Sequence, residues 1–111
     1  MNIQIIGTKK CQNTRKAERF FKERGQKYFT LDLNEKPLSP GELRNILNKV
    51  SSDELVDQES KVYKQKFAFL DFDPAEELLA YPDLIKTPII RCDGKVSIGY
   101  DPKTWKTWIE G

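Results

Sequence analysis

The segment Thr8-Lys9-Lys10-Cys11-Gln12-Asn13-Thr14-Arg15-Lys16-Ala17 decides the fold, because it joins an apolar strand to a charged helix. The strand is expected at Asn2–Ile6 and stops at Gly7. From Asn13 onward the apolar residues recur with a helical period of 3.6, and the charged residues fill the remaining faces. The pattern therefore predicts a strand, a short basic loop and a helix.

Cys11 is expected at or just before the N-terminus of this helix. Free backbone N–H groups and the positive end of the helix dipole favour a thiolate at such a place. Lys9, Lys10 and Arg15 add positive charge nearby. We therefore predict that the sulfur of Cys11 is the reactive atom of the protein, with Arg15 as part of the catalytic group.

The composition is that of an ordinary globular protein. A chain of 111 residues buries roughly two thirds of its unfolded surface, so we expect one domain, residues 1–111, and a monomer. The run Ile3–Ile6 is too short for a signal peptide or a spanning helix, which predicts a cytoplasmic protein without a membrane partner. The net charge of +2, with basic and acidic residues interleaved, argues against direct binding of nucleic acid.

The chain has two cysteines and no histidine. Without a secretory signal, two cysteines are expected to be reduced thiols rather than a structural bridge. The absence of histidine removes Cys–His and Ser–His nucleophile pairs and the common zinc sites, so no metal and no bound cofactor is predicted. Activation of Cys11 must then come from the helix end, nearby cations and a hydroxyl group.

The first half of the chain predicts a β-α-β unit followed by helices. The helix Asn13–Arg24 is closed by Gly25, and a second strand is expected at Gln26–Asp32, parallel to the first. Residues 35–85 then read as a helical insertion. Its expected parts are a helix at Pro40–Lys49, a helical turn through Val56 and a helix from Asp73-Pro74 through Ala80. No regular structure is predicted for the polar segment Asp57–Lys66.

The last part of the chain predicts a β-hairpin and a helix. Asp93-Gly94 is a two-residue turn signal between strands at Ile89–Cys92 and Lys95–Gly99. Asp101-Pro102 opens the last helix. Its apolar residues, expected to pack on the sheet, are Trp105, Trp108 and Ile109.

This order of elements, with a cysteine at the first helix, is similar to the thioredoxin fold, an α/β fold with a four-stranded mixed sheet. More specifically, the chain resembles the glutaredoxin-like arsenate reductase (ArsC) and Spx family. The segments that carry the resemblance are Cys11–Ala17, Pro37-Leu38-Ser39, Ser60-Lys61-Val62-Tyr63, Leu84–Ile90 and Val96–Tyr100. They spread over almost the whole chain in the expected order.

The resemblance implies a substrate site around Cys11. It implies that the Thr87–Pro88 bond is cis and that its turn faces the thiol; the alternative is a trans proline that starts an edge strand. The residues expected to bind the substrate are Lys10, Lys86, Thr87, Pro88 and Tyr100.

Three positions depart from the arsenate reductases that the chain resembles. Where that family implies arginines around the cysteine, this sequence has Glu59 (or Gln58), Thr87 and Tyr100. The bidentate guanidinium contacts to arsenate are thus missing, and a lysine such as Lys86 does not reproduce the fork. We therefore expect arsenate to be a poor substrate.

Thr14 occupies the place where Spx-type proteins carry the second cysteine of a C-x-x-C pair. Its hydroxyl can donate a hydrogen bond to the Cys11 thiolate, or it can cap the first turn of its own helix. Cys92 lies about 13 Å along a strand from Pro88, beyond the roughly 7 Å that a disulfide allows between Cα atoms. No second thiol is therefore expected in reach of Cys11.

Three functions fit these observations. The first is an oxidoreductase in which Cys11 attacks a small-molecule or protein disulfide and is released by an external thiol such as glutathione. The second is a regulator like Spx that binds RNA polymerase, through its alpha subunit, without catalysis. The third is a family member whose cysteine is a half-buried relic.

Overall fold

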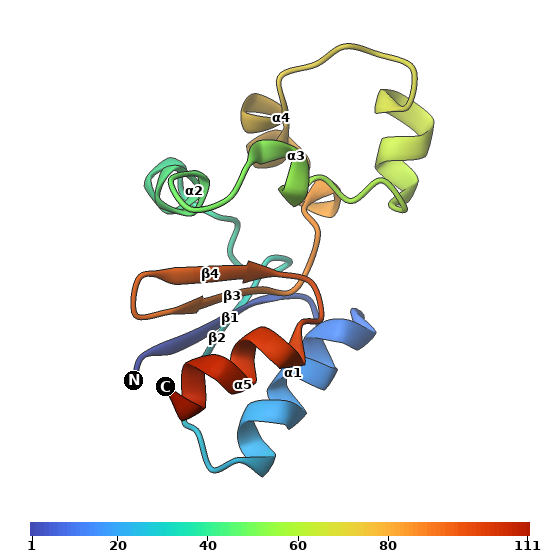
Figure 1. The fold of residues 1–111 in the computed structure, drawn as a ribbon. Helices are drawn as coiled ribbons and strands as arrows, with labels where there is room; N and C mark the ends of the chain where they lie inside the picture. Colours follow the sequence, from blue (N-terminus) through green and yellow to red (C-terminus); the bar gives the residue numbers. More distant parts are fainter.

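The computed structural model describes residues 1–111 as a mixed four-stranded sheet with helices on both faces (Figure 1). The strands lie in the order β2-β1-β3-β4. β1 runs parallel to β2 and antiparallel to β3, and β3 runs antiparallel to β4. The predicted α/β class, the parallel first pair and the hairpin are confirmed. The strand bounds are β1 Ile3–Gly7, β2 Phe29–Asp32, β3 Ile89–Cys92 and β4 Lys95–Ile98.

The second strand is three residues shorter than predicted, because the exit from the first helix takes up those residues. α1 spans Gln12–Glu23. Gly25 has a φ of 68° and donates its N–H to the Lys22 carbonyl at 3.1 Å, and the Gln26 N–H bonds to the Phe21 carbonyl at 2.9 Å. These bonds satisfy the last carbonyls of the helix, so pairing with β1 begins only at Phe29.

The hairpin and the last helix follow the predicted pattern. Asp93 and Gly94 have φ values of 48° and 85°, as a two-residue turn between twisted strands requires. α5 (Pro102–Glu110) buries Trp105 completely, and the indole Nε1 donates a hydrogen bond to the Ser97 hydroxyl at 2.7 Å. Trp108 and Ile109 pack against the same core cluster, which confirms that this face of α5 lies on the sheet.

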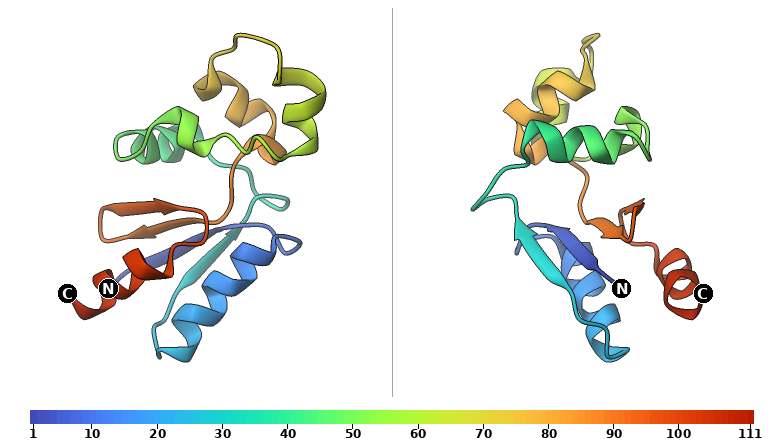
Figure 2. Two further views of the ribbon diagram at one scale, coloured as in Figure 1. Left: turned by 45° about the vertical axis from the view of Figure 1, so that its right-hand side comes forward. Right: turned by 90° about the vertical axis from the view of Figure 1, so that its left-hand side faces the viewer.

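The helical insertion lies on the other face of the sheet from α1 and α5, as the left view of Figure 2 shows. A reciprocal cap opens its first helix: the Ser39 hydroxyl accepts from the Glu42 N–H, and the Glu42 carboxylate accepts from the Ser39 N–H. A π-helical turn, Tyr63–Phe67, overlaps the end of the polar segment Asp57–Lys66, for which no regular structure was predicted. The other parts are α2 Pro40–Leu47, α3 Ser52–Leu55, α4 Pro74–Ala80 and a 3₁₀ turn at Pro82–Leu84.

The sheet separates two apolar cores because side chains alternate along each strand. Ile3 and Ile5 belong to the cluster shared with α1 and α5. Ile6 and Ile89 belong to the cluster shared with the insertion. Ile6, near the C-terminal end of β1, pairs with Ile89, the first residue of β3. The loop from β1 to α1 therefore begins beside the connection that leads from the insertion into β3.

Candidate functional site

Cys11 is the N-cap residue of α1. The loop from β1 turns back through a hydrogen bond from the Cys11 N–H to the Thr8 carbonyl at 3.2 Å. The Cys11 carbonyl then accepts from the Arg15 N–H at 3.2 Å, which is the first bond of the helix. The side chain is half-buried and the thiol is free. The predicted place of the cysteine, at the start of the first helix, is thus confirmed.

The surroundings of the sulfur lower its pKa. Burial by itself raises the pKa of Cys11, but hydrogen bonding from the Thr14 and Thr87 hydroxyls and from the Thr14 and Asn13 N–H groups outweighs it, so the net pKa lies below the ordinary value. No charged side chain is among the causes. The thiolate is therefore favoured by hydrogen-bond donors, and not by the cations that the sequence placed nearby.

The turn before β3 contacts the sulfur of Cys11. The Cys11 thiol donates to the Thr87 carbonyl, with 3.7 Å between Sγ and the oxygen. The Thr87–Pro88 bond is cis, as the resemblance implied, and Pro88 is fully buried. Two backbone bonds to the insertion hold this connection: Lys86 N–H to the Leu55 carbonyl at 2.7 Å, and Asp57 N–H to the Leu84 carbonyl at 2.8 Å.

Thr14 lies one turn along α1 with its side chain buried at 6% exposure. Its hydroxyl oxygen is buried and forms no hydrogen bond while the thiol is neutral. The same hydroxyl lowers the pKa of Cys11. A buried hydroxyl without a partner is costly, so ionisation of the sulfur supplies the acceptor that it lacks. Of the two predicted roles for Thr14, these contacts favour the bond to the thiolate over capping of its own helix.

Gly7 makes room for this threonine. A Cβ at Gly7 would lie within bonding distance of the Thr14 hydroxyl and 2.6 Å from its methyl group. Sequence reasoning identified Gly7 only as the end of a strand. The missed signal is the glycine itself: a residue without a side chain at position 7 leaves space for the side chain of Thr14, three positions after Cys11.

Gly7→Ala is expected to lower the free energy of unfolding by about 1–3 kcal/mol, because the new methyl group displaces the Thr14 side chain. The same displacement should raise the pKa of Cys11. Gly41→Ala is the matched control, since its Cβ would meet only the Ser39 hydroxyl at 4.0 Å. Denaturant unfolding and the pH dependence of alkylation measure the two effects; equal stability of both variants would contradict this assignment of Gly7.

A family model described as the ArsC family matches residues 6–108. The chain belongs to the ArsC family. It is 33% identical over 106 residues to the global transcriptional regulator Spx 2 of Oceanobacillus iheyensis, a match that covers 90% of this chain and 78% of that protein.

Two solved structures show that this ArsC-family chain has the thioredoxin-like fold that the sequence predicted. The YffB protein superposes with a TM-score of 0.86 at 20% identity, over 95% of this chain and 96% of that one. A glutaredoxin of Archaeoglobus fulgidus superposes with a TM-score of 0.51 at 15% identity, over 98% and 86% of the two chains. At these identities the likeness concerns the fold alone.

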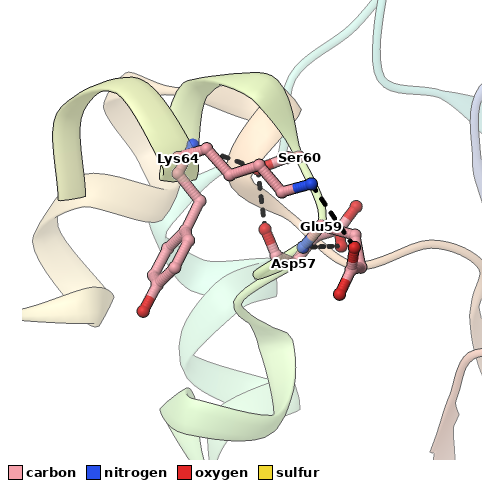
Figure 3. Close-up of polar contacts among 5 residues, drawn as sticks. Asp57, Glu59, Ser60 and Lys64 are labelled. Atoms are coloured by element: carbon pink, nitrogen blue, oxygen red, sulfur yellow. Dashed lines mark hydrogen bonds and ion pairs between the residues drawn. The ribbon is translucent and has the colours of Figure 1, made fainter. Parts of the chain in front are cut away.

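Glu59, which with Gln58 is one of the two residues that the resemblance places at a family arginine, contacts its own segment of this ArsC-family protein (Figure 3). Its carboxylate pairs with Lys64 at 3.5 Å, and its N–H donates to the Asp57 carboxylate at 3.0 Å. The Ser60 hydroxyl bonds to the Asp57 carbonyl and accepts from the Tyr63 N–H. The Glu59 side chain is 88% exposed, so it presents a carboxylate to solvent and no anion-binding fork.

The other predicted site residues, Lys10, Arg15, Lys86 and Tyr100, make no contact with the Cys11 sulfur among the hydrogen bonds and causes of its lowered pKa. Lys10 and Arg15 are exposed at the loop and on the first turn of α1. Lys86 is exposed beside Gly99, where its side chain lines a hollow with Glu54. Tyr100 is 47% exposed and stacks edge-on against Trp105 at 5.6 Å. Their roles toward a substrate stay predictions.

Cys92 is part of the apolar core and not of the candidate site. It lies on β3 opposite Ile3 and Lys95, with 3% exposure. Burial raises the pKa of its thiol, and Asp93 raises it further. A buried neutral thiol is a poor nucleophile, so the prediction of a reactive cysteine concerns Cys11 and not Cys92.

The structure contains no group of three or more cysteine and carboxylate side chains placed to hold a metal ion. None of its helices has the length and apolar character needed to cross a bilayer.

Proposed function

We propose that this ArsC-family protein is a thiol-dependent reductase that uses Cys11 as its single nucleophile and glutathione as the external reductant. The observation that carries the proposal is a half-buried thiol at the start of α1, with a lowered pKa, in contact with the turn at Thr87–Pro88. A reactive thiolate near neutral pH is what disulfide exchange requires.

The reaction balances with one cysteine. The Cys11 thiolate attacks the glutathione sulfur of a glutathionylated substrate, forming a disulfide between Cys11 and glutathione and releasing the substrate thiolate, which takes up a proton. A second glutathione thiolate attacks that disulfide, so that oxidised glutathione leaves and the Cys11 thiolate returns. One glutathione thiol in each turnover replaces the resolving cysteine, and the cytoplasm is the compartment that supplies it.

Arsenate is not the substrate that this site favours. The resemblance places the family's arginines at Glu59 (or Gln58), Thr87 and Tyr100, none of which is a cation. The Glu59 carboxylate is exposed to solvent. A panel of arsenate, a small disulfide and a glutathionylated peptide, each with and without glutathione, tests the substrate class. We expect turnover of the disulfides that depends on glutathione and none of arsenate; reduction of arsenate alone would overturn the proposal.

The pH dependence of alkylation tests the state of the thiol. Only the thiolate reacts, so the rate of reaction with iodoacetamide rises as the pH passes upward through the pKa of Cys11, with a midpoint below the ordinary value for cysteine. Thr14→Val removes the hydroxyl and should move this midpoint upward, whereas Thr14→Ser should leave it low. The measurement uses a Cys92→Ala background, and a midpoint that Thr14→Val leaves unchanged would contradict the role of Thr14.

A second candidate function is regulation of transcription without catalysis. The observation that favours it is the 33% identity to a protein named as the global transcriptional regulator Spx 2. The partner in this case would be the alpha subunit of RNA polymerase. Capture of that purified subunit by this protein, together with no turnover of any disulfide in the panel, would favour this function over the reductase.

A further inference from the structure

The exposed side of α1 carries positive charge that the protein itself does not neutralise. The ion pairs within 4.0 Å are Lys9–Glu35, Lys64–Glu59 and Lys106–Glu110. None of them involves a cation of α1 or its C-cap. The unpaired basic residues are Arg15, Lys16, Arg19, Lys22 and Arg24, all of them exposed.

Two of these cations are held over aromatic rings. The Arg24 guanidinium lies 3.8 Å from the centre of the Phe20 ring and donates to the Phe20 carbonyl at 3.2 Å. The Lys16 ammonium lies 5.5 Å from the centre of the Tyr100 ring. Rings orient these side chains without cancelling their charge, so less side-chain entropy is lost when an anion binds them.

Three of the basic residues line one open hollow between α1 and the start of α5. These two elements lie side by side in Figure 1. The α1 side of the wall of the hollow contains three cations and two other residues, and the α5 side contains Tyr100 and Pro102. The residues from the α1 side are Lys16, Arg19, Arg24, Phe20 and Glu23, the last being the single acidic residue. The volume of the hollow is about 340 Å³. The hollow thus combines three cations with an exposed aromatic ring.

We propose that this hollow, which we call the α1–α5 hollow, is a docking surface for an acidic, extended segment of a protein partner. The inference rests on the proposed function, because the segment would present its disulfide to Cys11 at the N-terminal end of the same helix. Along α1, Lys16 lies about 7 Å and Arg19 about 12 Å beyond Cys11. An extended chain advances about 3.3 Å per residue, so the acidic residues lie roughly two and four positions from the reactive sulfur of the partner.

The charge pattern favours a peptide over a nucleic acid. A nucleic-acid strand carries a negative charge at every nucleotide, so a strand that fills the hollow would bring phosphates close to the Glu23 carboxylate. A peptide can place a neutral or apolar side chain at that point and on the Tyr100 ring. Each exposed ion pair contributes little by itself, so affinity here requires several pairs together with contact to the ring.

The test measures non-covalent binding in the Cys11→Ser chain, so that it does not depend on catalysis. Fluorescence anisotropy compares three labelled peptides that carry serine in place of the reactive cysteine, with glutamate, glutamine or lysine at the second and fourth positions from it. We expect the glutamate peptide to bind about tenfold more tightly than the glutamine peptide, with affinity that falls as salt rises.

Variants of the hollow make the test specific. Lys16→Gln/Arg19→Gln/Arg24→Gln should remove the preference for glutamate, whereas Arg44→Gln/Lys49→Gln/Lys95→Gln, which loses the same charge elsewhere, should keep it. Lys16→Glu/Arg19→Glu should instead favour the lysine peptide. Turnover of a small disulfide should stay unchanged in all three variants with Cys11 intact.

The outcomes separate the two proposals. Equal binding of the three peptides, equal losses in the two glutamine variants, or tighter binding of a single-stranded oligonucleotide than of the glutamate peptide would overturn the docking surface. Binding with the expected preference, but no turnover of any disulfide by the intact chain, would support the docking surface and overturn the reductase.

Discussion

Cys11→Ser is expected to reduce the turnover of a glutathionylated peptide by at least about 10³-fold, to the rate of glutathione alone. A serine hydroxyl is not ionised near neutral pH and cannot form a disulfide, so both steps of the reaction are lost. The loss should appear in kcat with the folded structure intact, because the Cys11 side chain is only half-buried and no apolar cluster includes it.

Cys92→Ala is the matched control for this prediction. It removes the other thiol of the chain, which is buried on β3 away from the site contacts, so turnover should remain close to that of the intact protein. The glutathione-dependent release of peptide thiol measures both variants. Turnover by Cys11→Ser above one tenth of the intact rate would show that Cys11 is not the nucleophile.

Trp105→Ala is expected to lower the free energy of unfolding by about 3–5 kcal/mol. The indole is fully buried and packs against Phe20 and Phe21 of α1, with ring centroids 5.3 and 5.4 Å away. Its removal leaves a cavity between α5, α1 and the sheet. It also leaves the buried Ser97 hydroxyl without the donor that now lies 2.7 Å away.

Trp108→Ala is the control for this substitution, because Trp108 lies on the same helix but is only partly buried. It should cost clearly less than Trp105→Ala. Urea unfolding followed by circular dichroism gives both free energies of unfolding. Circular dichroism is used because each variant loses one of the two tryptophans, which changes the fluorescence signal. An equal loss of free energy of unfolding in the two variants would contradict the conclusion that Trp105 contributes more to this core than Trp108.

The positions of the helices and strands could be predicted closely because their signals are local. Ser39 and Glu42 form the expected reciprocal cap, and Asp93-Gly94 forms the expected turn. The prediction for the second strand was too long because Gln26 bonds back to α1, a contact that depends on how the helix ends. The π-helical turn at Tyr63–Phe67 has no comparable signal, since its segment is polar without a clear period.

The cause of the lowered pKa of Cys11 was predicted only in part. The helix start was identified correctly, and backbone N–H groups of Asn13 and Thr14 do favour the thiolate. The cations were expected to contribute, but Lys9 pairs with Glu35 at 3.5 Å, and Lys10 and Arg15 extend into solvent. Charges that lie in water are screened, whereas hydroxyls in contact with the sulfur are not.

The sequence by itself determined the order of the elements and the place of Cys11 at the start of a helix. Hydrophobic period, caps and turn residues act within a few positions along the chain, and these features follow from them. Only the tertiary structure decided which groups contact the sulfur: the Thr87 carbonyl comes from 76 positions away, and the Thr14 hydroxyl depends on the space left by Gly7. Such contacts follow from the packing of α1 and the insertion on the two faces of the sheet, which no local pattern contains.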